Sequence, residues 1–339
     1  MGKPLEGVRV LDLSRLLPGP YASLLLSDLG ADVVKIEDPD PGDYLRAISP
    51  GMFAALNRGK RSAVVDLKSA EGVAQLRAHC ERADVLIESF RPGVLERLMP
   101  PPWPPRLIVC RISGFGQRES AWRDRAGHDV GYLALAGVLS HNRALPNVQL
   151  ADLFGGAQQA VIAILAALHE RARTGRGRAL DVSMTHGVTG LILARLGGAD
   201  EPQILDGSRP CYRVYACAGG GAYALGALEP KFWQRFCVAV SRPDWIERGF
   251  DTALVPELER LFAQRSRDEW DALLRPADCC GEPVLSLAEL RDHPLLRDLF
   301  AGDLPRTFPA LVPSAELPPQ RAPGHGEHTP QVLREWAHG

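Results

Sequence analysis

Hydrophobic positions along the first 185 residues follow two alternating patterns. Short runs rich in β-branched residues predict buried strands at 7–13, 32–37, 62–67, 83–89, 106–115 and 179–185. Apolar residues at helical spacing lie between some of these runs and predict helices over 21–29 and 69–82. Strands that alternate with helices are typical of an α/β fold, with a parallel sheet that is covered on both faces.

The pattern changes in the second half of the chain. A long apolar helix is predicted from Asp152 to about Arg173. Beyond residue 200, a glycine turn at 219–221 predicts a β-hairpin within 207–228. Helices are predicted over 230–240, 255–265 and 286–300. A last helix is expected near the C-terminus, with Thr329 as its cap and Pro330 in its first turn.

These patterns predict two domains. The large domain spans 1–190 and is completed by 305–339, which returns from the C-terminus. The small α+β domain spans 205–300. A chain of 339 residues is long enough to bury such cores without disulfides or structural metals.

Composition and charge narrow the class of protein. The 39 Lys and Arg residues nearly balance 41 Asp and Glu residues, which excludes a strongly basic nucleic-acid binder and an acidic disordered tail. The seven cysteines form no CxxC pair and match no zinc spacing, so no metal is predicted. The first residues do not resemble a signal peptide, and the apolar runs 132–139 and 160–168 fall short of a membrane span of ~20 residues. We therefore expect a cytoplasmic protein with no nucleic-acid or membrane partner.

The opening strand, turn and helix are similar to the start of a dinucleotide-binding fold. The turn, SRLLPGP, has one glycine where that fold's fingerprint has three. Without those glycines the backbone does not come close to a pyrophosphate. A nicotinamide cofactor is therefore not predicted.

Three places combine ionisable groups with the start of a helix. His128 and Asp129 precede an apolar helix whose first N–H groups are suited to a developing oxyanion. A structural His128 beside a capping Asp129 is the alternative, and by themselves these residues favour it. Asp152 precedes the long helix and has the same alternative, an N-cap. Glu229 follows a strand and precedes a helix, and by itself it says little. Gly155 and Gly156 each cost ~1 kcal/mol relative to alanine in a helix, which indicates close approach of a ligand or of another backbone.

A basic run stands just before the predicted strand 62–67. It predicts an anion site for phosphates, and a solvated surface run is the alternative. Its candidate residues are Asn57, Arg58, Lys60 and Arg61, with Arg91 from the later SFRPGV segment.

Taken in order, these segments resemble the class III CoA-transferase family and, within it, the α-methylacyl-CoA racemases. The motifs that carry the resemblance are LEGVRVLDLSRLLPGPYASLLLSDLGADVVKIE, FAALNRGKRSAVVDLKS, ADVLIESFRPGVLERL, ISGFGQ, GHDVGYLALAGVLS, LADLFGG, ALHERARTGRG and GALEP. The resemblance implies a Rossmann-like large domain with a parallel sheet, built from both ends of the chain, and a smaller domain. It also implies a homodimer of interlocked chains, whose active site combines the large domain of one chain with the small domain of the other.

The resemblance also implies roles for the candidate residues. Asp152 matches the family's shared aspartate, which is a nucleophile in the transferases and an acid/base group in the racemases. His128 and Glu229 match the racemase motifs, so we expect racemisation of 2-methylacyl-CoA thioesters by 1,1-proton transfer through an enolate. His128 and Asp152 would exchange the proton, Glu229 would orient His128, and backbone N–H groups near Asp129 would stabilise the enolate oxygen. The residues expected to hold the CoA phosphates are Asn57, Arg58, Lys60, Arg61 and Arg91.

No cofactor is implied beyond the CoA of the acyl-CoA substrate. A CoA-transferase that forms an acyl anhydride on Asp152 is the first alternative, and a non-catalytic CoA-binding relative is the second. Many racemases of the family bind the acyl chain on a methionine-rich surface, whereas this chain has only four methionines. The count therefore gives little support to a long, flexible acyl pocket of that kind.

Overall fold

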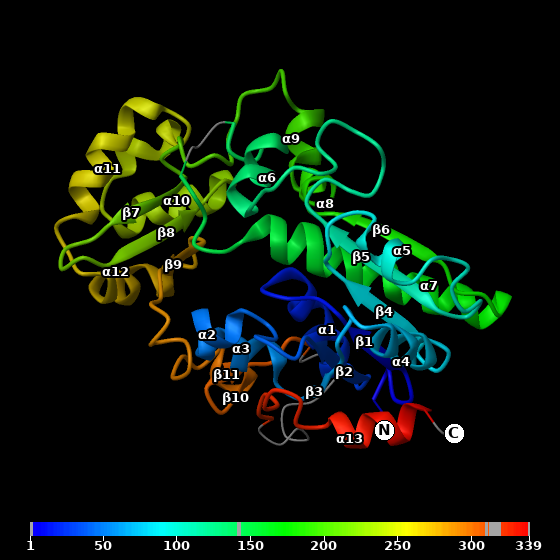
Figure 1. Ribbon diagram of the computed structural model, residues 1–339. Helices are drawn as coiled ribbons and strands as arrows, with labels where there is room; N and C mark the ends of the chain where they lie inside the picture. The colour runs from blue at the N-terminus through cyan, green and yellow to red at the C-terminus, as the bar shows by residue number, and fades with distance from the viewer. Residues whose placement is uncertain (1–2, 141–143, 309–310, 312–319, 338–339) are drawn as a thin grey trace. The chain divides into compact units, whose positions relative to one another are not determined.

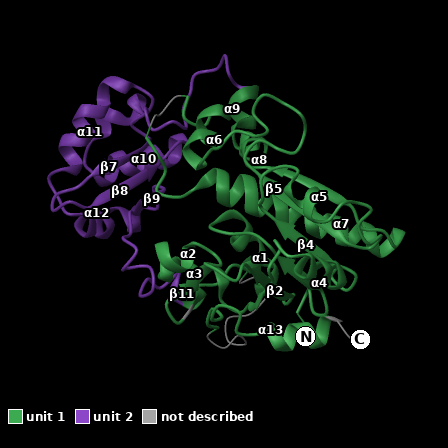
Figure 2. Ribbon diagram, viewed as in Figure 1, with its two compact units in different colours: residues 1–197, 298–339 green, residues 198–297 purple. Residues whose placement is uncertain are grey.

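A computed structural model of the chain describes residues 3–140, 144–308, 311 and 320–337. Two compact units divide it, residues 1–197 with 298–339 and residues 198–297 (Figure 2). The corresponding predicted domains were 1–190 with 305–339 and 205–300. The chain thus leaves the first unit once and then returns to it.

The first unit contains the parallel sheet that the strand pattern predicted. Six strands lie in the order β3-β2-β1-β4-β5-β6, and every neighbouring pair is parallel (Figure 1). The strands are β1 (Arg9–Asp12), β2 (Asp32–Glu37), β3 (Arg61–Val64), β4 (Val85–Glu88), β5 (Ile108–Ser113) and β6 (Ala179–Ser183). The strand order reverses between β1 and β4, the kind of place where open parallel sheets leave a crevice at their carboxyl ends.

Two hydrophobic cores cover the two faces of this sheet. Val10 and Leu11 are neighbours in β1 and both are fully buried, yet each belongs to a different core. Successive side chains of a strand point to opposite faces, so both faces are covered. The Val10 core includes residues of α1 (Pro18–Asp28), α6 (Asp129–Leu135), the π-helix η1 (Ala151–Gln158), α7 (Gln159–Thr174) and α8 (Met184–Thr189). The Leu11 core includes residues of α4 (Ala70–Cys80), α5 (Val94–Leu98) and α13 (Thr329–Ala337).

The short elements of the first unit are α2 (Leu45–Ile48), α3 (Pro50–Asn57), the 3₁₀ helix η2 (Gly190–Ile192), α9 (Leu193–Gly197), and the small hairpin of β10 (Phe300–Ala301) and β11 (Leu304–Pro305). The 3₁₀ helix η6 (Arg297–Leu299) spans the boundary between the two units.

The second unit is an antiparallel sheet with helices, as predicted. The hairpin of β7 (Tyr212–Ala216) and β8 (Ala222–Gly226) turns through Gly219 and Gly220, whose φ angles of 75° and 85° favour glycine. Strand β9 (Gly281–Pro283) extends the sheet. The predicted helices over 230–240 and 255–265 are confirmed as α10 (Pro230–Ala239) and α11 (Val255–Phe262). The remaining helices are α12 (Arg267–Leu274) and the 3₁₀ helices η3 (Pro243–Arg248), η4 (Thr252–Leu254) and η5 (Arg275–Ala277).

Three local predictions need correction. No α-helix exists over the described residues 286–300, because apolar residues there do not find a core: Leu287 and Leu295 are 87% and 78% exposed. Helix α12 was not predicted, although its capping box of Ser266 and Glu269 was visible in the sequence. Thr329 is the first residue of α13 instead of its cap, and its hydroxyl oxygen accepts the N–H of Val64 at 2.9 Å.

Helices η1 and α7 form one continuous helix, Ala151–Thr174. By length and composition alone it could cross a membrane, the one such helix among the described residues. Core helices meet the same criteria, and 44% of its most apolar window is buried inside the structure. Ala157, Ala160 and Ile164 are fully buried in the first core. The helix is therefore accounted for by its packing in the first unit.

Candidate active site

The segment that carries His128 connects β5 to α6. His128 is the N-cap of α6, with an extended backbone and an exposed side chain that makes no capping bond to the described residues. The loop before it lies close over Tyr132: a Cβ at Gly114 or Gly127 would lie 2.6 Å from atoms of the Tyr132 side chain. Glycine at these two positions therefore lets the loop that ends in His128 pack against α6.

The segment that carries Asp152 begins the long helix. Asp152 lies in the first turn of η1, whose N-cap is Leu150, so Asp152 is not the cap itself. Local π-helical turns are rare in proteins, and those that do occur are frequently found at functional sites. A Cβ at Gly155 would lie 2.4 Å from the carbonyl oxygen of Met184, and one at Gly187 would lie 2.1 Å from the carbonyl oxygen of Gly155. Close approach of another backbone therefore explains Gly155.

The side chain of Asp129 joins these two segments. Its Oδ1 accepts the N–H of Ala151 at 2.7 Å and the N–H of Asp152 at 3.0 Å. Asp129 does cap a helix, as one interpretation of the sequence suggested, but it caps η1 and not the helix in which it lies. This contact fixes the start of η1 to the start of α6.

The electrostatics distinguish Asp152 from an ordinary surface carboxylate. Burial and the negative charge of Asp129 raise the pKa of Asp152 to about 6, and His128 opposes them. A carboxyl group with such a pKa gains and loses a proton near neutrality, which suits general acid/base chemistry. Burial and the charges of Asp152 and Asp129 raise the pKa of the Tyr132 hydroxyl to about 12, so Tyr132 stays neutral.

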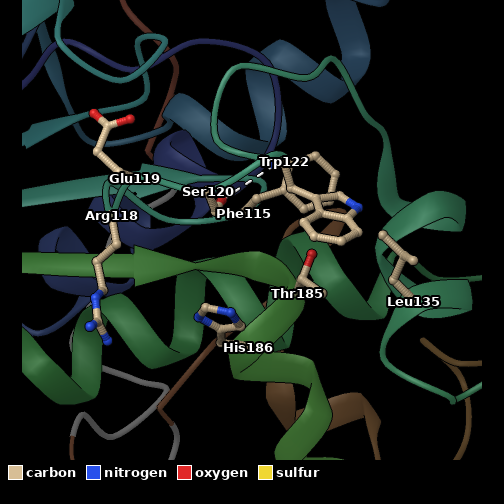
Figure 3. A pocket seen from close by; sticks show the side chains of 8 residues that line it. All are labelled: Phe115, Arg118, Glu119, Ser120, Trp122, Leu135, Thr185 and His186. Atoms are coloured by element: carbon tan, nitrogen blue, oxygen red, sulfur yellow. Dashed lines mark hydrogen bonds between the residues drawn. The ribbon is translucent and has the colours of Figure 1, made fainter.

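A cavity of about 400 Å³ lies beside this region, in the first unit. Its lining residues come from the loop after β5, from α6 and from α8 (Figure 3): Phe115, Arg118, Glu119, Ser120, Trp122, Leu135, Thr185 and His186. The ring of Phe115 packs edge-to-face on Tyr132, with ring centroids 5.3 Å apart. The amino-acid sequence does not predict this cavity, because its walls come from three separate segments that share no motif.

The basic run before β3 is largely internal. Asn57 is fully buried and Lys60 is 4% exposed. The Lys60 ammonium donates to the carbonyl oxygen of Pro20 and to Oδ1 of Asn57, both at 2.8 Å, and lies 3.3 Å from Oδ2 of Asp12. Burial lowers the pKa of Lys60 to about 7 although Asp12 opposes it. A solvated surface run is therefore wrong for Lys60 and Asn57, and their burial argues against direct contact with a phosphate.

The three arginines differ in exposure. Arg58 pairs with Asp28 and Arg61 with Asp32 and Glu335, through N–O contacts of 2.5–2.8 Å. Arg91 is exposed, and its guanidinium lies 3.4 Å from the carbonyl oxygen of Asp124. The phosphate site stays a prediction, and of the five proposed residues only Arg91 has an exposed side chain.

Glu229 belongs to the second unit, whereas His128 and Asp152 belong to the first. It is the N-cap of α10, and its carbonyl oxygen accepts the N–H groups of Phe232 and Trp233. Burial, together with the negative charge of Glu229, raises the pKa of Cys280 in the same unit. The predicted contact of Glu229 with His128 stays a prediction.

Comparison with known proteins identifies the family. The sequence profile of CoA-transferase family III matches residues 5–329. The chain is 36% identical to human alpha-methylacyl-CoA racemase, over 98% of this chain and 93% of that protein. It is 30% identical to formyl-CoA:oxalate CoA-transferase of Escherichia coli O157:H7, over 99% and 96%. A crystal structure of a CAIB/BAIF family protein from Brucella suis covers 99% of this chain and 100% of its own, with a TM-score of 0.83 and 26% identity. The chain therefore belongs to CoA-transferase family III, and it is an enzyme of the class that acts on acyl-CoA thioesters.

Proposed function

We propose that this enzyme racemises 2-methylacyl-CoA thioesters by 1,1-proton transfer through an enolate. The observation that carries the proposal is the pKa of Asp152, which burial and the charge of Asp129 raise to about 6. His128 acts on the same carboxyl group in the opposite direction. Identity of 36% to human alpha-methylacyl-CoA racemase supports the same reaction.

The reaction needs two groups that exchange roles. The α-proton of a thioester is weakly acidic, and inversion requires its removal from one face and delivery to the other. His128 removes the proton from one hand of the substrate while protonated Asp152 supplies a proton to the opposite face. For the other hand the two residues exchange roles, so each must take up and release a proton near the working pH.

The start of α6 supplies stabilisation for the enolate. The first N–H groups of a helix lack intrahelical acceptors, and α6 begins at Asp129. Each well-placed donor to a developing oxyanion is worth ~3 kcal/mol. Phe115, Trp122 and Leu135 give the cavity beside Tyr132 an apolar wall suited to an acyl chain.

A homodimer is part of the proposal. Glu229 from the small domain of one chain would orient His128 of the other, and Arg91 would contact the CoA phosphates. Leu193 and Leu196 of α9 are 72% and 58% exposed in the single chain, which supports burial against a second copy. A solution mass of one chain, measured by light scattering, would contradict this part.

A CoA-transferase is the second candidate. The 30% identity to formyl-CoA:oxalate CoA-transferase extends over nearly the whole chain. In that reaction Asp152 attacks the thioester carbonyl, CoA leaves as the thiolate, and an acyl anhydride forms on the carboxyl group.

One experiment separates the two candidates. The enzyme is incubated in deuterated water with one epimer of a 2-methylacyl-CoA, with and without an added carboxylic acid. Deuterium at the α-carbon together with loss of chirality supports racemisation. Transfer of CoA to the added acid without α-exchange would overturn it in favour of the transferase.

The role of His128 is tested in the same assay. His128→Ala is expected to slow α-exchange by about 10²-fold or more, because one of the two acid/base groups is removed. His169→Ala is the matched control, since His169 is an exposed histidine of α7. Unchanged exchange in His128→Ala would show that another group moves the proton.

A further inference from the structure

The carboxylate of Asp129 lies in α6 but forms its hydrogen bonds with a different helix, η1. Its Oδ1 accepts two N–H groups of η1, from Ala151 and Asp152, at 2.7 and 3.0 Å. These N–H groups lie at the start of a helix, where no intrahelical acceptor exists and a negative charge is favoured. Ala151 is fully buried, so water is a poor substitute for this acceptor.

We propose that the side chain of Asp129 is a positioning residue, which fixes the His128 segment to the first turn of η1 and holds a negative charge beside the Asp152 carboxyl group. This inference rests on the proposed function to the extent that His128 and Asp152 act as a pair. It adds a role for the side chain to the enolate-stabilising role proposed for the N–H groups at this position.

The first effect is geometric. His128 and Asp152 lie at the starts of two different helices, and residues 136–150 connect these helices. The two bonds from Asp129 provide a shorter link, because Asp129 directly follows His128 and bonds to the N–H of Asp152 itself. Displacement of a reacting group by about 1 Å can cost on the order of 10²-fold in rate, so this link matters for a pair that must face one carbon.

The second effect is electrostatic. Asp129 and His128 are the groups whose charges act on the Asp152 carboxyl, and they act in opposite directions. The titratable side chains of α1, α7, α8, β5 and β6, which also pack against η1, add no comparable influence; Tyr21, Asp28, Asp181 and His186 are among them. The charge of Asp129 therefore adjusts the acidity of Asp152 from outside the reacting pair.

Two substitutions separate the effects. Asp129→Asn keeps an oxygen acceptor of the same shape and removes the charge, whereas Asp129→Ala removes both. Asp124→Asn is the matched control, because it removes a charge from the same loop at a side chain that is 71% exposed. The measurements are the pH profile of kcat/KM for α-exchange and direct titration of the Asp152 carboxyl by ¹³C NMR.

We expect Asp129→Asn to lower the pKa of Asp152 by about one unit, because the like charge is gone. For the hand from which Asp152 removes the proton, the acid limb of the rate profile should move to lower pH by the same amount; for the other hand, the alkaline limb should do so. Asp129→Ala should show the same shift and in addition a fall in kcat of about tenfold or more at the pH optimum, as the link is lost. Asp124→Asn should leave both measurements unchanged.

An unchanged Asp152 titration in Asp129→Asn would overturn the inference. A shifted titration in a protein that does not racemise its substrate would refute the proposed function and leave the inference standing. Should Asp129→Ala fail to fold, Asp129→Asn decides alone, since it keeps the acceptor for both N–H groups.

Discussion

At Asp152 and Asp12 burial of a carboxyl group accompanies opposite shifts of its pKa. Burial raises the pKa of Asp152, and the nearby charge of Asp129 adds to the effect. Burial also disfavours the charged form of Asp12, yet Lys35, Lys60 and the hydroxyls of Ser14 and Ser23 outweigh it and lower the pKa of Asp12 to about 2. Asp12 is therefore a permanently ionised structural group, whereas Asp152 can exchange a proton.

The raised pKa of Asp152 predicts a cost in stability. Between the unfolded pKa of about 3.8 and the folded pKa of about 6, the folded state binds the proton more tightly, so the free energy of unfolding falls as the pH rises through this window. Asp152→Asn should therefore raise the free energy of unfolding at pH 7 by about 1–2 kcal/mol, after allowance for partial exposure, and abolish α-exchange.

Urea unfolding at pH 7 and pH 4 measures this prediction. The gain in Asp152→Asn should shrink towards pH 4, where the wild-type carboxyl is protonated in the folded state. Asp124→Asn again serves as the control. A variant less stable than wild type at pH 7 would show that the charge of Asp152 is compensated in the folded protein.

At the scale of elements, the site depends on how closely η1 approaches α8. Gly155 and Gly187 bring the two backbones together, because a Cβ on either would meet main-chain atoms of the other segment. Met184 and Val188 of α8 belong to the same buried core as Ala151 and Ala157 of η1. This contact supports the turn that carries Asp152.

Gly187→Ala should therefore separate η1 from α8. The added Cβ would lie 2.1 Å from the carbonyl oxygen of Gly155, and overpacking of this kind costs about 1–3 kcal/mol. Gly190→Ala is the matched control, because a Cβ there has no atom within 4 Å. Thermal unfolding of both variants is the measurement, and equal melting temperatures would contradict the close contact.

At the scale of the whole molecule, the C-terminal return completes the first unit. Val332 and Trp336 of α13 are buried in the core that also contains Leu76 of α4. The Arg9 guanidinium lies 5.6 Å from the centre of the Trp336 ring, and His79 packs edge-on against the same ring. The last helix of the chain thus packs in the same hydrophobic core as the first strands of the sheet.

Trp336→Ala should destabilise the first unit by about 3–5 kcal/mol, as loss of a large buried aromatic side chain does. Arg334→Ala, an exposed change in the same helix, should alter the free energy of unfolding by less than about 0.5 kcal/mol. Denaturant unfolding followed by circular dichroism compares the two. Equal effects would show that α13 is docked only loosely.

Local patterns predicted most of the elements, because the periods of strands and helices are visible within a few residues. The strands of the parallel sheet, the β7–β8 hairpin and helices α10 and α11 are confirmed. The helix expected over 286–300 is wrong, since its apolar residues lack a core to pack on. Helix α12 is the reverse case: it was not predicted, although its capping box is a local signal in the sequence.

The alternation of strands and helices, and the candidate residues at the starts of helices, follow from the amino-acid sequence alone. The partner of each charge depends on how the chain folds. Lys60 lies next to Arg61 in a basic run, yet its ammonium is buried beside Asp12, 48 residues away. Asp129 bonds to η1, 22 and 23 residues away. Periodicity is a local property of the backbone, whereas electrostatic partners and burial depend on segments that meet only when the sheet and its helices pack.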